Sequence, residues 1–289
     1  MSRIGIALLW LLHFLPLGAL AALGNTLGAL SYGLARKRRQ VTLVNLGKCF
    51  PHMSPAERER LARAHFRAVT RAFLEHAILW WAPRSRIERL IRLEGLQHLR
   101  ALGSAPIILL VPHFVGLDAG ATRLACEINA VSMYARQKDR HIEALLHHGR
   151  SRFGDQLLVS RQQGIREVIR PVREGRPLYY LPDMDYGPRG ALFVPFFGVA
   201  AATTPGLSRI AAATGARVLP FVTRMLPGGA GYVATIEPPW QDFPTDDVEA
   251  DTRRMNAYIE HKVLEMPEQY YWVHRRFKTR PEGEPGFYA

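Results

Sequence analysis

An uncharged apolar segment at the amino terminus sets the first limit on what this chain can fold into. No Asp, Glu, Lys or Arg occurs in the 32 residues from Ile4 to Ala35. A helix needs only about 20 such residues to cross a hydrocarbon core roughly 30 Å thick. The segment ends in the basic run 36–39, which is typical of a stop-transfer flank. We therefore expect a membrane anchor with its basic flank at residues 1–39, and a second unit at residues 40–289.

Two other interpretations of this segment remain open. Ala19-Leu20-Ala21 fits the small-x-small pattern of a signal-peptide cleavage site, and a buried hydrophobic helix has a similar composition. The apolar run continues well beyond Ala21, which favours a retained anchor, either spanning the bilayer or lying in its interface. The positive-inside rule then places the basic run and everything after it on the cytoplasmic side.

The net charge limits the kinds of partner that this chain can bind, and its cysteine content limits the metal sites and disulfides that it can form. The net charge of the 289 residues is +13, so a partner attracted by electrostatics should be anionic. Cys49 and Cys126 belong to no C-x-x-C pair and have no adjacent histidine. We therefore expect no metal site and no disulfide framework, and the two thiols fit a reducing compartment. No nucleic-acid-reading motif accompanies the basic residues, so we expect a membrane surface and no nucleic acid.

The pattern after the anchor indicates long helices first. Residues 40–51 read as a connector, and the capping box Ser54-Pro55-Ala56-Glu57 marks a helix start. Apolar residues then recur near a 3.6-residue period, which predicts one helix over 55–81. A second helix is expected over 84–102.

Beyond Ser104 the pattern changes to alternating strands and helices. Short apolar runs predict strands at 106–111, 130–135, 177–181, 192–197, 216–223 and 232–236. Helical patterns lie among or after them, at 117–128, 140–152, 164–174, 205–214 and 247–265. This alternation indicates an α/β fold: one domain with a mixed, largely parallel central sheet flanked by helices and preceded by the membrane helix.

A histidine and an aspartate follow the first of these strands. His113 comes directly after Pro112, and Asp118 lies five residues later. If His113 lies in the loop and Asp118 in the first helical turn, the carboxylate can orient the imidazole, and the second ring nitrogen can take a proton from a hydroxyl. Taken alone, the pair is equally compatible with a loop histidine beside an unrelated first-turn aspartate. No G-x-S-x-G, Walker, H-E-x-x-H or G-x-G-x-x-G motif offers a competing chemistry.

Several segments together resemble a known family. The H-x(4)-D unit is similar to the signature of the lysophospholipid acyltransferase superfamily. The segments Leu181-Pro182-Asp183-Met184-Asp185-Tyr186-Gly187-Pro188, Phe193–Gly198 and Tyr271–Pro281 resemble the bacterial lipid A late acyltransferases, the lauroyl and myristoyl transferases. The chain departs from that family where Met184 replaces a frequent glutamine, and it carries H-x(4)-D where many members have H-x(4)-E. The F-P-E-G-T-R block of glycerol-phosphate acyltransferases is missing.

The resemblance implies a reaction, its partners and its site residues. A fatty acyl chain would pass from acyl carrier protein to a hydroxyl of the phosphorylated lipid A precursor, without a cofactor, on the cytoplasmic face of the bacterial inner membrane. His113 would be the general base, oriented by Asp118, and Arg150, Asp183 and Asp185 would belong to the site. Arg136, which ends a predicted strand, is a further candidate cation. A solvated helix face for Arg150 and turn formation for the two aspartates are the simpler alternatives.

Two other functions remain open at this point. An acyltransferase of the same fold could act on another glycolipid, an aminolipid or a lysophospholipid. A non-enzymatic membrane protein that binds anionic lipid would also suit the basic composition. Loss of turnover in His113→Ala, with the fold kept, would separate an enzyme from a binding protein.

Overall fold

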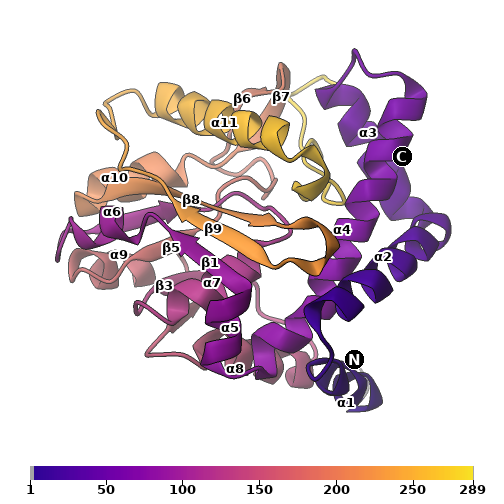
Figure 1. The fold of residues 1–289 in the computed structure, drawn as a ribbon. Helices are drawn as coiled ribbons and strands as arrows, with labels where there is room; N and C mark the ends of the chain where they lie inside the picture. The colour runs from indigo at the N-terminus through magenta and orange to yellow at the C-terminus, as the bar shows by residue number, and fades with distance from the viewer. Residues whose placement is uncertain (1–2, 289) are drawn as a thin grey trace.

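A seven-stranded sheet lies at the centre of the computed structural model, which describes residues 3–288 (Figure 1). Its strand order is β1-β9-β8-β2-β5-β3-β4. The strands are β1 Ile91–Glu94, β2 Ile107–Leu110, β3 Val131–Tyr134, β4 Leu157–Ser160, β5 Leu178–Tyr180, β8 Arg217–Met225 and β9 Tyr232–Ile236. β8, β2, β5, β3 and β4 are mutually parallel, and β9 pairs antiparallel with β8. The expectation of a mixed, largely parallel sheet in one α/β domain is confirmed.

Helices cover both faces of this sheet. One face packs against α7 Leu117–Ala125, α5 Arg84–Leu90 and part of α4 Pro55–Trp81; the other packs against α9 Arg166–Arg173, α10 Gly206–Thr214 and α11 Val248–Glu265. α8 Arg140–Ser151 packs beside α4 and α7, and α3 Arg36–Cys49 packs along α4. α6 Leu96–Arg100 and the 3-10 turns η1 Pro227–Gly229 and η2 Pro267–Gln269 complete the connections.

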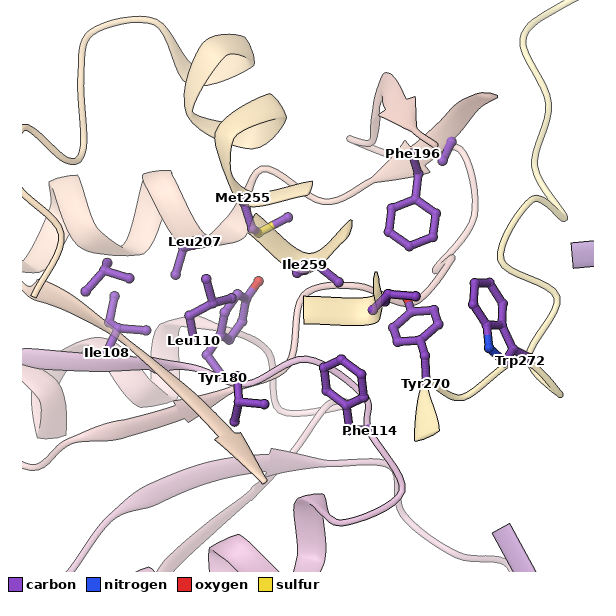
Figure 2. Close-up of a cluster of buried hydrophobic side chains, with 14 of the residues drawn as sticks. Ile108, Leu110, Phe114, Tyr180, Phe196, Leu207, Met255, Ile259, Tyr270 and Trp272 are labelled. Atoms are coloured by element: carbon purple, nitrogen blue, oxygen red, sulfur yellow. The ribbon is translucent and has the colours of Figure 1, made fainter. Parts of the chain in front are cut away.

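Alternation along β2 explains why the sheet has two hydrophobic cores. Ile107 and Leu109 face the α4–α7 side, whereas Ile108 and Leu110 face the α10–α11 side, and all four are fully buried. Figure 2 shows the second core, in which Leu110 lies near Met255 and Ile259 of α11. This core also includes a group of four aromatic side chains. That group is Phe114, Phe196, Tyr270 and Trp272. Buried on both faces, β2 rigidly positions the loop that follows it.

The amino-terminal segment forms two helices and not one. α1 Arg3–Leu12 and α2 Leu17–Leu34 are separated around Pro16, which has no backbone N–H and adopts an extended conformation at the N-cap of α2. α2 is long and apolar enough to cross a membrane by length and composition, and 33% of it is buried within the protein. The division into residues 1–39 and 40–289 stays a prediction, and its ends, Met1–Ser2 and Ala289, lie outside the described residues.

Some of the other predicted helices and strands are confirmed and some are wrong. The helix over 55–81 is confirmed, including its capping box and Pro55 at the first turn. The helix expected over 84–102 is wrong, because β1 divides it into α5 and α6. The connector expected at 40–51 is largely α3. Three strands were missed, β1, β4 and β7 Val199–Thr203, and the predicted strand at 192–197 is β6 Leu192–Phe196, which pairs with β7 outside the main sheet.

Candidate active site

His113 lies in the loop that follows β2, as the sequence predicted. The backbone of this loop pairs with the carboxy-terminal segment: Val115 N–H donates to Gln269 O at 2.8 Å, and Tyr271 N–H donates to His113 O at 3.0 Å. These bonds fix the loop between the sheet and the segment that carries Tyr271–Pro281. The imidazole is thereby held at the carboxyl edge of the parallel strands, where open α/β sheets usually bind ligands.

The carboxylate on His113 is Asp183, which corrects the prediction that Asp118 orients the ring. His113 Nδ1 donates to Asp183 Oδ1 at 2.6 Å, and His113 N–H donates to Asp183 Oδ2 at 2.9 Å. The reason is topological: β5 is the neighbour of β2, so the loops after these two strands meet at one edge. Because Nδ1 carries the proton, Nε2 is left as the basic nitrogen. No hydrogen bond to Nε2 is present within residues 3–288.

Burial and neighbouring charges shift the pKa of Asp183 in opposite directions. Its side chain is fully buried, which by itself would raise its pKa. The charge of His113 and the two hydrogen bonds from His113 outweigh burial, with help from Arg276, and the pKa of Asp183 is lowered. Asp183 is therefore an ionised carboxylate, able to stabilise a protonated His113.

Asp118 holds a second polar cluster. It lies in the first turn of α7, as predicted, but its carboxylate accepts from Arg150 Nη2 at 3.1 Å through Oδ1 and from His76 Nε2 at 3.1 Å through Oδ2. Burial would raise the pKa of Asp118, but the charges and hydrogen bonds of Arg150 and His76 lower it well below its usual value. The cluster joins α4, α7 and α8 on the wall of the same cavity.

The remaining predicted residues have different placements. Asp185 is buried and accepts from Gly187 N–H, Thr279 N–H and the Thr279 hydroxyl, so it fixes the turn and the carboxy-terminal segment. Arg136 follows β3 and is exposed, and it does not line the cavity that contains His113. The structure thus brings together His113 and Asp183, and separately Asp118 and Arg150, but not Arg136.

Sequence reasoning missed two histidines at the site. His76 lies 42 residues before Asp118, too far for any local spacing to connect them. His274 Nε2 accepts from Asp185 N–H at 3.1 Å; burial and then the positive charge of His113 lower the pKa of His274 to about 4, so it is neutral. His274 does lie within the Tyr271–Pro281 segment that the resemblance had singled out. Residues 3–288 contain no group of three His, Cys, Asp or Glu side chains able to hold a metal.

A cavity of about 1220 Å³ joins these groups. It runs along the carboxyl edge of β2, β5, β3 and β4, and reaches both faces of the sheet. On one face its wall is largely apolar and comes from α4, α7 and α8, with Val69, Phe73, Trp80, Ala121, Leu124 and Leu146. On the other face α9, α10 and the loop after β4 contribute Arg161, Arg166 and Arg209. The cavity therefore combines room for a hydrocarbon chain with cations for a charged group.

The arginines on the α9–α10 side are not neutralised. All three are exposed, and none of them forms an ion pair with a carboxylate of the described chain. Arg161 instead stacks over the Tyr186 ring, with its guanidinium carbon 4.0 Å from the ring centroid. This side of the cavity is thus suited to an anionic ligand.

Comparison with known proteins gives the family of this chain. Residues 1–279 match the family model described as bacterial lipid A biosynthesis acyltransferase. The lipid A biosynthesis lauroyltransferase of Escherichia coli K12 is 36% identical over 100% of this chain and 94% of its own length. The palmitoleoyltransferase of the same strain is 32% identical over 98% of this chain and 93% of its own, and the myristoyltransferase is 34% identical over 89% and 80%. A match of this extent shows that the chain belongs to the bacterial lipid A biosynthesis acyltransferase family.

Proposed function

We propose that this protein transfers a fatty acyl chain from acyl carrier protein to a hydroxyl of a lipid A precursor. The single observation that carries the proposal is the His113–Asp183 pair beside a cavity that combines largely apolar walls with arginine side chains. Relatives that transfer lauroyl, palmitoleoyl and myristoyl groups support the acyl chain and the lipid A acceptor. The lipid A precursor is phosphorylated, and the unpaired arginines suit that charge.

The proton path follows from the hydrogen bonds of His113. Nε2 takes the proton of the acceptor hydroxyl while the oxygen attacks the thioester carbonyl. Asp183 stabilises the imidazolium that forms. The tetrahedral intermediate collapses as the C–S bond breaks, the thiolate of the carrier takes the proton from Nε2, and an ester of the acceptor remains. The proton returns to the leaving group, so His113 ends the cycle as it began.

We propose no covalent acyl-enzyme intermediate. Cys49 and Cys126 are buried, and burial raises the pKa of both thiols, which makes them poor nucleophiles. Direct attack by the acceptor hydroxyl therefore fits the chain better than a thioester intermediate on the protein. Arg150, anchored by Asp118 on the cavity wall, is the candidate to stabilise the oxyanion.

The amino-terminal segment supports a location at the inner membrane. α2 is the candidate span, and the basic run 36–39 follows it directly at the start of α3. The positive-inside rule then places the sheet and the cavity on the cytoplasmic face of the inner membrane. Acyl carrier protein and the precursor would both reach the cavity from that side.

One pair of measurements tests the function. Purified full-length protein is incubated with acyl carrier protein loaded with a labelled fatty acid and with a phosphorylated lipid A precursor, and the lipid products are analysed by mass spectrometry. We expect a mass gain of one acyl group with the wild type and none with His113→Ala of unchanged melting temperature. Transfer by His113→Ala at the wild-type rate, or acylation of a lysophospholipid or aminolipid in place of the precursor, would overturn the proposal.

A further inference from the structure

His76 is a partly buried histidine on the cavity wall, and each of its ring nitrogens faces a hydrogen-bond acceptor. Nδ1 lies 2.6 Å from the Ala72 carbonyl oxygen, one turn back along α4, and Nε2 lies 3.1 Å from Asp118 Oδ2. The ring packs edge-on against Trp80, with centroids 5.0 Å apart. Only 19% of the side chain is exposed, and it faces the cavity.

These contacts define the protonation state of His76. A carbonyl oxygen only accepts hydrogen bonds, and Asp118, which also binds Arg150, is an ionised carboxylate that only accepts. Neutral imidazole has one N–H, so either neutral tautomer would turn a lone pair toward one of these oxygens. The imidazolium, with two N–H groups, satisfies both. Burial alone would lower the pKa of His76, but the hydrogen bond and charge of Asp118 outweigh it and raise that pKa.

The charges around His76 leave this cluster positive. From α7 it faces Asp118, and beyond that carboxylate lies Arg150 of α8. Its neighbour on α4, Glu75, is turned to Arg71 and the Tyr232 hydroxyl, and the Tyr179 hydroxyl of β5 donates to the Leu117 carbonyl oxygen. Two cations therefore share one carboxylate, which gives a net charge of +1 on the cavity wall.

We propose that His76 is a positioning residue of the acyl-transfer site, held as an imidazolium that fixes Asp118 and so presents the Arg150 guanidinium to the cavity. This inference rests on the proposed function. Arg150 uses one of its guanidinium nitrogens on Asp118, and 31% of its side chain is exposed. Asp118 orients Arg150 without neutralising the cluster, because His76 supplies the second positive charge. The negative charge that develops during thioester attack would meet this cation.

The charge state of His76 can be measured without any substrate. Full-length protein with ¹⁵N-labelled histidine, in detergent micelles at neutral pH, is examined by NMR with and without His76→Gln to assign the ring signals. We expect both ring nitrogens of His76 to carry a proton. One protonated and one unprotonated nitrogen would overturn the proposal, whether or not the preparation transfers acyl chains. Absence of acyl transfer by wild-type protein would instead refute the proposed function.

The positioning role is tested by the pH profile of kcat/KM. Gln keeps an N–H donor at this position but carries no charge, so we expect His76→Gln to lower kcat/KM roughly 10- to 100-fold through misplacement of Arg150. Wild-type activity should also fall at alkaline pH as His76 loses its proton, and His76→Gln should lack that limb. The matched control is His65→Gln, a histidine of the same helix that is buried away from the cavity.

The control separates positioning from stability. His65→Gln should change the melting temperature but leave the shape of the pH profile intact. If His76→Gln likewise changed only the melting temperature, and its kcat/KM and alkaline limb matched the wild type, His76 would be a structural tie between α4, α7 and α8 and the proposal would be wrong.

Discussion

Replacing Asp183 by Asn should disable the base while leaving the fold in place. Both carboxylate oxygens are in use: Oδ2 accepts from the His113 backbone N–H, and Oδ1 accepts from Nδ1. Asn has only one oxygen. If that oxygen keeps the backbone bond, the NH₂ group faces Nδ1, and the ring proton moves to Nε2 because Nδ1 must then accept. His113 would hold a proton where it needs a lone pair.

The size of this effect can be set by analogy with a serine-protease triad. The equivalent carboxylate-to-amide change there lowers kcat about 10⁴-fold through the wrong tautomer. At about 1.4 kcal/mol per tenfold change, this is roughly 5.5 kcal/mol of transition-state stabilisation. The Asp183 side chain is 0% exposed, so water cannot take over its role. We therefore expect a loss of about 10³- to 10⁴-fold.

Single-turnover acyl transfer, with enzyme in excess over acyl carrier protein, measures the chemical step directly. Asp118→Asn is the matched control, because Asp118 binds His76 and Arg150 and not His113. We expect Asp118→Asn to be the milder variant. If Asp183→Asn stayed within tenfold of the wild type, or if Asp118→Asn caused the greater loss at equal melting temperature, then Asp118 would be the orienting carboxylate and the reasoning from the hydrogen bonds would fail.

Three further predictions address the cavity and its surroundings. Arg166→Ala with Arg209→Ala should raise the KM for the phosphorylated lipid A precursor several-fold and weaken its dependence on salt, because both guanidinium groups are unpaired cations; an unchanged KM across a salt series would exclude them from binding. Gly149→Ala should lower the free energy of unfolding by about 1–3 kcal/mol, since its Cβ would lie 2.1 Å from Trp80 Cδ1; equal urea midpoints would contradict this. Burial lowers the pKa of His65 to about 4, so the unfolded chain binds a proton that the folded chain does not between pH 6.5 and 4. Stability should therefore fall over that window by about 3 kcal/mol, and His65→Gln should flatten the slope in urea titrations.

The sequence predicts best those helices and strands that are specified by residues near one another in the chain. The helix 55–81 has its capping box, its Pro55 and a long apolar period within a single stretch, so neighbouring residues specify it. β1 was missed because Ile91–Glu94 is a four-residue strand between two short helices, and only its pairing with β9 makes it a strand. β4 is of the same kind, because its partner β3 lies before α8 in the chain. β7 is different: its partner β6 directly precedes it, and the missed signal is the tight turn at Phe197-Gly198, where both residues have positive φ.

The site shows the same division between local and distant information. His113 was found because it directly follows a buried strand. Its carboxylate was misassigned because Asp118 is near in sequence, whereas Asp183 is near only after β5 pairs with β2. His76 carried no signal, since a histidine on a long amphipathic helix looks the same whether it faces a core, solvent or a cavity. The orientation of α4 against α7 decides this, and that is a property of the tertiary structure.

The contact between α2 and α4 ties the proposed membrane helix to the wall of the cavity. Gly24 and Gly28 lie one turn apart on α2, where a Cβ would come within 2.7 Å of Arg71 Cα and 2.5 Å of Arg67 Cα. The backbones of the two helices therefore touch, which leaves α2 no freedom to act as a flexible tether. α4 continues from this contact to His76 and Trp80 on the cavity wall. If α2 lies in the lipid as proposed, its depth there would fix the height and tilt of the cavity above the membrane surface, and with them the alignment of a lipid acceptor.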